Sequence, residues 1–295
     1  MQLKDALARA IARLTTENVP SPRMNAELLL MFTLGCDRAY LFAHPEREIS
    51  PEEESRYEAA LAERSRGVPA QYITGHQEFW GMDLIVTPAV LIPRPETEHV
   101  IETVLELQAS GVGRQAPGPQ ISDAAYPEVR IVDVGTGSGC IALALAKELA
   151  QAEIRATDIS PDALEIARAN TARHHLERRI QFHRTDLLEG LQGDFDFVVS
   201  NPPYVGESEE DQVQLEVRKF EPRSAVFAGP AGTEVIARLI PQARTTLRRG
   251  GWLIMEISGT IAKEVKVLLE GWQEVEIKPD LQSIPRVVRA RRPNT

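Results

Sequence analysis

The strongest constraint on the fold is an alternation of strand-like apolar runs and helical patterns that begins at Val129. Short runs rich in Val and Ile are separated by segments in which apolar residues recur at helical spacing. The expected strands are residues 130–134, 154–157, 180–183, 195–200, 252–257, 275–278 and 287–290. Because parallel neighbours need crossover connections, this pattern predicts an α/β fold with a doubly wound, largely parallel sheet. The last two runs have no helix between them and are expected to form an antiparallel hairpin at the sheet edge.

The first 75 residues show helical spacing and no strand-like run. Four helices are expected, beginning near Leu3, Pro22, Asp37 and Pro51. The last begins with the tetrapeptide Ser50-Pro51-Glu52-Glu53, which has the composition of a capping box. We expect residues 1–75 to form a small N-terminal helical domain that recognises or positions a substrate; a purely stabilising role is the alternative.

A β-hairpin linker is expected over residues 76–94, from two β-rich runs at 79–86 and 90–92 that flank Thr87-Pro88-Ala89. Residues 95–295 then form the main domain, whose first helix starts after Pro93-Arg94-Pro95. Residues 110–128 are rich in Gly, Pro, Gln and Ala without periodicity, which indicates a surface loop.

Composition narrows the functional classes. The chain has 295 residues, a net charge of −10 and only two cysteines, Cys36 and Cys140. The acidic balance disfavours a protein that tracks a long phosphate backbone, so no DNA partner is expected. Two cysteines are too few for a disulfide scaffold, His174-His175 lacks a third ligand nearby, and no metal site is expected. With neither a signal peptide nor an apolar run long enough to span a membrane, we expect a cytoplasmic protein, a monomer, without a membrane partner.

A glycine-rich turn follows the first strand of the main domain. Gly135-Thr136-Gly137-Ser138-Gly139 opens a helix, which is the arrangement that lets a nucleotide-like cofactor approach the backbone. Asp158 ends the next strand about 20 residues after Gly137, the usual offset of an acidic residue that binds ribose hydroxyls. Its alternative role is to cap the helix after Ser160. Asp186 and Leu187, after the third strand, are placed to meet an adenine amine and ring face.

The fourth strand ends in Asn201-Pro202-Pro203-Tyr204. Two prolines lack N–H donors and have a fixed φ, so the loop is stiff and rich in acceptors. With the Asn201 amide oxygen and the Tyr204 ring, it forms a socket for a planar group that carries an NH2. A proline-rich turn without a function is the alternative for these four residues taken alone.

Together, residues 133–139, Asp158 and residues 201–204 resemble class I S-adenosylmethionine-dependent methyltransferases, whose sheet is Rossmann-like and which methylate amide or amino nitrogen. More narrowly, the chain is similar to the bacterial release factor glutamine N5-methyltransferases. The further matching segments are Gln71-Tyr72-Ile73-Thr74-Gly75, Phe79-Trp80-Gly81, Ile92 to Glu98, Glu221-Pro222-Arg223 and Ala228 to Gly232.

This resemblance implies methyl transfer from S-adenosyl-L-methionine, with S-adenosyl-L-homocysteine as product, to N5 of the glutamine in the GGQ motif of class 1 peptide chain release factors. It implies that Asn201 and Pro202 bind the amide N–H groups through their oxygens, that Tyr204 packs on the amide plane, and that Pro203 completes the substrate loop. The implied cofactor-binding residues are Gly135, Thr136, Gly137, Ser138, Gly139, Asp158, Asp186, Leu187 and Asn201. No general base is evident.

Two segments depart from the family pattern, residues 256–260 and residues 280–286. Both are expected to lie away from the chemistry. Three alternatives remain for the function: methylation of adenine N6 in nucleic acid, methylation of a glutamine in a ribosomal protein, and a nicotinamide oxidoreductase. A non-catalytic cofactor-binding protein is the alternative from a different class.

Overall fold

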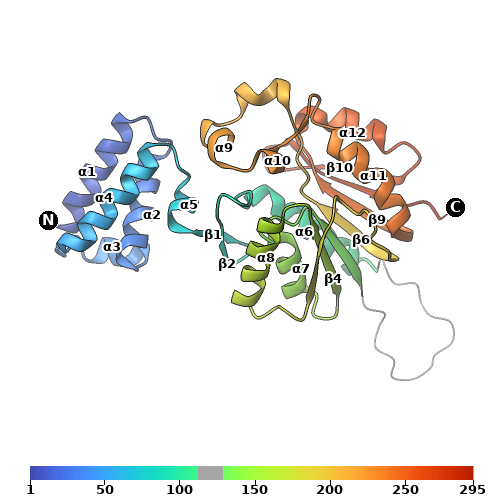
Figure 1. Ribbon diagram of the computed structural model, residues 1–295, viewed down its shortest axis with the longest axis horizontal. Coiled ribbons are helices and arrows are strands. Elements are labelled where there is room, and N and C mark those ends of the chain that lie inside the picture. Colours follow the sequence, from blue (N-terminus) through green and yellow to red (C-terminus); the bar gives the residue numbers. More distant parts are fainter. Residues whose placement is uncertain (112–128, 295) are drawn as a thin grey trace. The chain divides into compact units, whose positions relative to one another are not determined.

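The computed structural model describes residues 1–111 and 129–294 (Figure 1). The chain forms two compact units. The helical unit contains Met1–His76 together with Gln214–Phe220, and the main unit contains Gln77–Val213 and Glu221–Thr295. The expected loop at residues 110–128 falls almost entirely outside the described residues. Within the described part of the chain, no helix is long and apolar enough to cross a membrane.

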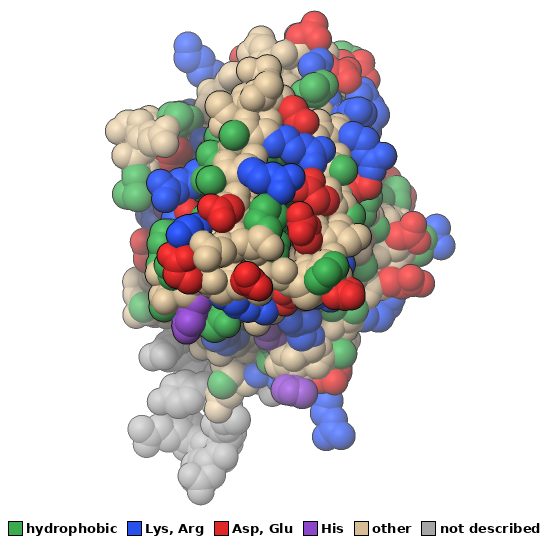
Figure 2. Space-filling model, turned by 90° about the vertical axis from the view of Figure 1, so that its left-hand side faces the viewer, with side chains coloured by type: hydrophobic (Ala, Val, Ile, Leu, Met, Phe, Trp, Pro, Cys, Tyr) green, Lys and Arg blue, Asp and Glu red, His purple; other side chains and the backbone are tan. Residues whose placement is uncertain are grey.

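The helical unit is built from short amphipathic helices around one apolar core. Its helices are α1 (Leu3–Thr16), α2 (Pro22–Leu34), α3 (Arg38–Ala43), α4 (Pro51–Ser65), α5 (Ala70–Thr74) and α9 (Leu215–Phe220). The first four confirm the sequence prediction, as does the capping box, in which Ser50 and Glu53 exchange hydrogen bonds. Acidic and basic side chains alternate on the face that Figure 2 presents, without a patch of one sign.

Helix α9 lies far along the sequence from the rest of its unit. It is held by Arg64, a buried residue of α4 whose guanidinium contacts Glu216 at 2.8 Å. The same guanidinium donates to Asn25 Oδ1 at 2.8 Å and to the Val68 carbonyl at 3.1 Å. A buried arginine needs all of these partners, because an unpaired buried charge is costly. The chain therefore leaves the main unit at residue 213, completes the helical unit, and returns at residue 221.

The main unit is a seven-stranded sheet with the order β10-β11-β9-β6-β3-β4-β5. Its strands are β3 (Arg130–Val134), β4 (Glu153–Asp158), β5 (Ile180–Arg184), β6 (Phe195–Ser200), β9 (Leu247–Glu256), β10 (Gln273–Pro279) and β11 (Pro285–Arg291). The pairs from β5 to β9 are parallel, whereas β11 and β10 are antiparallel to their neighbours. This order confirms the predicted doubly wound sheet with an antiparallel hairpin at one edge.

Helices cover both faces of this sheet (Figure 1). One apolar cluster joins the sheet to α6 (Glu98–Ala109) and α7 (Cys140–Glu148), and a second joins it to α11 (Glu234–Thr246) and α12 (Ala262–Leu268). Helix α8 (Pro161–Arg173) packs on β4 and β5. Short helices η1 (Pro95–Thr97), η2 (Glu207–Gln212), α10 (Arg223–Val226) and η3 (Gly259–Ile261), with the two-stranded sheet β7 (Val205–Gly206) and β8 (Phe227–Gly229), complete the connections.

The β-hairpin exists, but its position differs from the prediction. Strands β1 (His76–Phe79) and β2 (Met82–Ile85) pair with each other, and residues 90–92 form no strand. The turn falls at Trp80 and Gly81, which both have positive φ, 52° and 64°. Two positive φ angles in a two-residue loop define the turn that best matches strand twist. The prediction of one β-rich run at 79–86 is therefore wrong. An aromatic residue such as Trp80 is typical of strands, so the sequence gives no sign that it lies in the turn.

Candidate functional site

Four strands end side by side at one edge of the sheet. The register pairs Val134 with Thr157 on one side and with Ser200 on the other, and Ser200 with Met255. The next residue on each strand therefore reaches the same edge. These residues are Gly135, Asp158, Asn201 and Glu256. In an open α/β sheet this carboxyl edge is where ligands bind.

The glycine-rich turn needs glycine for two different reasons. Gly135 and Gly137 have φ of +69° and +56°, and a Cβ at either position would meet nothing within 4 Å. They are required by backbone conformation, and they leave open space beside the backbone. Gly139 also has a positive φ, +85°, and it is tightly packed as well, because a Cβ there would lie 2.6 Å from Leu143 Cδ1 and 3.3 Å from Ala167 Cβ. The turn thus combines an open cradle with tight contact between α7 and α8.

Asp158 joins the glycine turn to the following loop. One carboxylate oxygen accepts from the Gly137 N–H and the other from the Ser160 N–H, each at 2.9 Å. Burial raises the pKa of this carboxyl, and the backbone N–H groups of Ser160 and Gly137 oppose that rise. Ser160 itself caps α8 by accepting from the Ala163 N–H at 3.2 Å. The N-cap is thus Ser160 and not Asp158, which supports the cap only through the Ser160 backbone, and both Asp158 oxygens keep a lone pair for ligand hydroxyls.

Asp133 lies directly beneath the turn and is fully buried. Its Oδ2 accepts from the Thr136 hydroxyl at 2.6 Å and from the Ala142 N–H at 3.2 Å. Its Oδ1 has no hydrogen-bond partner among the described residues. Burial raises the pKa of the carboxyl to about 7. Asp133 does not line the cavity described below; it ties the glycine-rich turn at Thr136 to the first turn of the following helix at Ala142.

The loop that follows β5 contributes Asp186 and Leu187 to the same edge. Both line the cavity described below, and Leu187 has a positive φ of 53°. The Asp186 carboxylate is paired with Arg238 of α11, which also lines the cavity. Sequence reasoning missed Arg238, because a single arginine within an amphipathic helix carries no local signal.

Residues 201–204, the acceptor loop, follow β6, whose Ser200 hydroxyl donates to the Val134 carbonyl at 2.7 Å. Asn201 and Pro203 line the cavity, whereas Pro202 is buried within the loop. The Asn201 side-chain NH2 donates to Thr97 Oγ1 at 3.0 Å. This bond leaves the Asn201 amide oxygen as the atom available to a ligand.

Behind Asn201 lies Glu256, a fully buried residue at the end of β9. Its carboxylate accepts from the Thr97 hydroxyl at 2.6 Å and from the Tyr204 hydroxyl at 2.9 Å. Burial raises the pKa of Glu256, and that of Tyr204 is also raised by burial and then by Glu256. The expectation that residues 256–260 lie away from the chemistry was therefore wrong. It failed because the pairing of β9 with β6, which brings Glu256 beside Asn201, is not visible in the local sequence.

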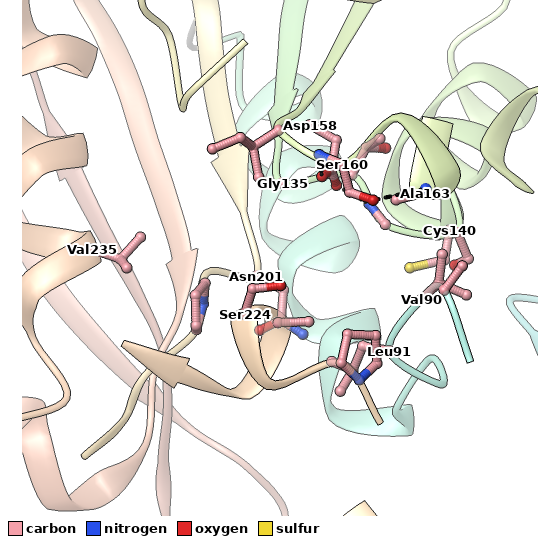
Figure 3. Close-up of a pocket in the computed structure, with 18 of the residues that line it drawn as sticks. Val90, Leu91, Gly135, Cys140, Asp158, Ser160, Ala163, Asn201, Ser224 and Val235 are labelled. Carbon is pink, nitrogen blue, oxygen red and sulfur yellow. Dashed lines mark hydrogen bonds between the residues drawn. The ribbon is translucent and has the colours of Figure 1, made fainter. Parts of the chain in front are cut away.

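These groups surround one cavity of about 370 Å³, which Figure 3 shows with Asn201 and Ser224 on one side and Asp158 with Ser160 on another. Every implied cofactor residue lines it except Gly139, which lies in the packing contact with α8. Of the implied substrate residues, Asn201 and Pro203 line it, while Tyr204 contacts Glu256. The lining residues that sequence reasoning did not assign include Ala89, Val90, Leu91, Pro93, Thr97, Cys140, Pro222, Ser224, Ala225 and Phe227.

Two of these unassigned stretches, at 89–93 and 222–227, are held together by Glu221. Its carboxylate accepts from the Ile92 N–H at 3.1 Å and pairs with Arg94. The Glu221 side chain is 1% exposed and that of Arg94 34%, so the ion pair is partly buried. The segments around Arg94 and Glu221 resembled the family, but only the fold shows that they act together.

Comparison with known proteins gives consistent results. Residues 5–75 match the family model of the PrmC N-terminal domain, and residues 121–219 match that of the methyltransferase small domain. A release factor glutamine methyltransferase from Koribacter versatilis is 52% identical over the whole of both chains. Proteins with the same name from Rhodopirellula baltica (40% identical, 91% of this chain and 88% of that one) and Deinococcus radiodurans (39%, 99% of both) are also similar.

Solved structures agree on the fold. The hMettl16 catalytic domain, in complex with an RNA hairpin from the MAT2A 3′UTR, has a TM-score of 0.55 and 17% identity, covering 82% of each chain. The T. thermophilus 16S rRNA N2 methyltransferase RsmC, in complex with AdoMet and guanosine, has a TM-score of 0.51 and 18% identity. It covers 74% of this chain and 49% of that one. At these identities the likeness establishes a class I methyltransferase fold.

Proposed function

The chain belongs to the release factor glutamine methyltransferase family, and from this we propose that it methylates the side-chain amide nitrogen of a release factor glutamine, using S-adenosylmethionine. The observation that carries the proposal is the alignment of a glycine cradle and an acceptor loop on adjacent strand ends, β3 and β6, around one cavity. The alternatives that methylate adenine or a ribosomal protein are not favoured, because the similar full-length relatives carry the release factor name.

The residues present suit this cofactor. The cradle at Gly135 and Gly137 admits the methionine end, and the Asp158 oxygens have lone pairs for the ribose hydroxyls. Asp186 and Leu187 are assigned to the adenine, with Arg238 holding the Asp186 carboxylate. When bound, S-adenosylmethionine supplies a methyl group that its sulfonium already activates for attack.

The chain's own task is to prepare a poor nucleophile. We assign Asn201 Oδ1 and the Pro202 carbonyl as acceptors for the two N–H groups of the glutamine amide. They orient the nitrogen toward the methyl group and favour the positive charge that develops on it. The proton that the amide nitrogen must lose on methylation would leave for these acceptors or for water. Tyr204, anchored through its hydroxyl to Glu256, stiffens this loop.

The finer assignments are also proposals. We propose that the substrate is the GGQ glutamine of class 1 release factors, that the enzyme is a cytoplasmic monomer, and that it does not act on DNA. We further propose that the helical unit recognises the release factor and that the main unit, which includes residues 77–94 of the predicted linker, carries the methyltransferase site.

A methylation assay with labelled S-adenosylmethionine tests the proposal. The full chain is incubated with a release factor, with the same factor in which the GGQ glutamine is alanine, and with DNA. Label should enter only the first. Asn201→Ala should abolish transfer while cofactor binding, measured by calorimetry, stays near wild type; Asn294→Ala at an exposed asparagine is the matched control. Near-normal turnover by Asn201→Ala would refute the role of this loop.

A further inference from the structure

Asn201, Thr97, Glu256 and Tyr204 form one continuous hydrogen-bond chain behind the acceptor loop. The Asn201 NH2 contacts Thr97 Oγ1 at 3.0 Å, Thr97 Oγ1 contacts Glu256 Oε2 at 2.6 Å, and the Tyr204 hydroxyl contacts Glu256 Oε1 at 2.9 Å. Thr97 and Glu256 are each 1% exposed, so water does not compete for these bonds. Two of the four side chains belong to the acceptor loop itself.

The direction of each bond follows from the atoms involved. The hydroxyls of Thr97 and Tyr204 both donate to Glu256, one to each oxygen of its carboxyl group. A threonine hydroxyl has a single hydrogen. Because the Thr97 hydroxyl donates it in the hydrogen bond to Glu256, Thr97 Oγ1 can only accept from Asn201. Asn201 must therefore turn its NH2 toward Thr97 and its oxygen away from it. An amide has two orientations of nearly equal shape, and this chain selects one of them.

We propose that Glu256 is a positioning residue that fixes the Asn201 amide with its oxygen toward the substrate, so that the site accepts rather than donates hydrogen bonds. The inference rests on the proposed function, in which Asn201 must accept an N–H from the glutamine amide. With the opposite orientation, the Asn201 NH2 would face the NH2 of the substrate glutamine. The substrate nitrogen would then have no Asn201 acceptor to orient it.

The burial of Glu256 supports this role over a purely structural one. A carboxylate removed from water is costly, and an apolar residue of similar volume would often stabilise a core more. Both oxygens of Glu256 contact side chains tied to the acceptor loop, and neither bond that they make there is to the backbone. Burial raises the pKa of the Glu256 carboxyl, and the hydroxyl donors of Thr97 and Tyr204 and the charge of Arg286 oppose that rise.

Glu256→Gln is the first test, because it keeps the shape and removes the second acceptor. Glutamine can accept from Thr97 or from Tyr204 but must present an NH2 to the other. The expected result is a kcat roughly tenfold to a hundredfold lower, with the Kd for S-adenosylmethionine unchanged. The matched control is Glu153→Gln, the same substitution at a partly buried carboxylate that pairs with Arg130 and Arg155 at the first residue of β4, the end of the strand opposite to Asp158. It should leave kcat unchanged.

A double-mutant cycle with Asn201→Asp separates positioning from structure. In the wild-type background, two carboxylates would face Thr97, which has one hydrogen to give, so Asn201→Asp should lower kcat roughly a hundredfold or more. In the Glu256→Gln background, the introduced glutamine donates to Thr97, Thr97 donates to the introduced aspartate, and the other aspartate oxygen faces the substrate. Asn201→Asp should then cost roughly tenfold or less, which is strong coupling within the cycle.

Thr97 provides an independent pair of variants. Thr97→Ser keeps the hydroxyl and should be several-fold more active than Thr97→Val, which is isosteric but leaves the Asn201 NH2 unpaired. Additive losses in the cycle, or equal activity of the two Thr97 variants, would overturn the positioning role. If wild-type protein fails to methylate a release factor, the proposed function fails instead. Cofactor binding and far-UV circular dichroism of each variant identify any that do not fold.

Discussion

The buried carboxyl of Asp133 should reduce stability at neutral pH, and Asp133→Asn should recover it. The pKa of Asp133 rises from its ordinary 3.8 to about 7 in the folded protein. Between these two values the folded state keeps a proton that the unfolded state has released. Stability contributed at this site therefore falls as pH rises from about 4 to about 7, and is constant above that.

The size of the effect follows from the same two pKa values. At about 1.4 kcal/mol for each tenfold change in ionisation, the wild-type protein loses about 4 kcal/mol across this range. The introduced asparagine would still accept from the Thr136 hydroxyl and the Ala142 N–H. Its NH2 would replace the unpaired Oδ1, and an unsatisfied buried donor costs about 1–3 kcal/mol. Above pH 7 the variant should therefore be more stable by about 1–3 kcal/mol.

Urea unfolding of the cofactor-free protein at pH 5 and pH 8 measures this prediction. Trp80, Trp252 and Trp272 all belong to the main unit, so their fluorescence reports the unit that contains Asp133. The wild type should be more stable at pH 5 than at pH 8, and the variant should show a smaller difference. The reasoning fails if Asp133→Asn is no more stable than wild type at pH 8 and keeps the wild-type dependence on pH.

Three further results are expected. Gly139→Ala should lower the free energy of unfolding by about 1–3 kcal/mol, because a φ of +85° strains alanine and its Cβ would approach Leu143; tryptophan fluorescence in urea measures it, and an unchanged midpoint would contradict the requirement for glycine. Arg64→Met should destabilise the helical unit by about 3–5 kcal/mol, since Glu216 and the other acceptors lose their donor; a thermal melt followed by circular dichroism tests this, and an unaltered melt argues against the anchor. Asp158→Asn should raise the Kd for S-adenosylmethionine roughly tenfold or more by calorimetry, and equal affinity would remove the ribose assignment.

The part of the site that sequence could predict is the part encoded by single strand–loop junctions. Gly135, Asp158 and Asn201 each follow an apolar run directly, and parallel strands bring such junctions to one edge. The largely parallel sheet and its antiparallel edge hairpin could be predicted from the alternation of strands and helices and from the short last connection, whereas the order of the strands was not predicted.

What sequence could not supply depends on contacts between distant segments. Thr97 and Glu256 are separated by 159 residues, and their hydrogen bond requires both the η1 turn and the register of β9. Arg238 approaches Asp186 only because α11 packs on the sheet. The membership of α9 in the helical unit likewise has no local signature, since its six residues depend on Arg64.

The path of the chain through α9 also orders events during synthesis. Domains generally fold from the N-terminus as the chain is made. Here α1 to α5 leave the ribosome while α9, the last helix of their unit, is still to be translated. The ion pair between Arg64 and Glu216 can form only after that. By then β6 and the Asn201 loop have been made, since both precede α9 in the chain. The helical unit, which emerges first, can thus be completed only after the acceptor loop has been synthesised. Its folding therefore finishes after synthesis of the main unit is well advanced.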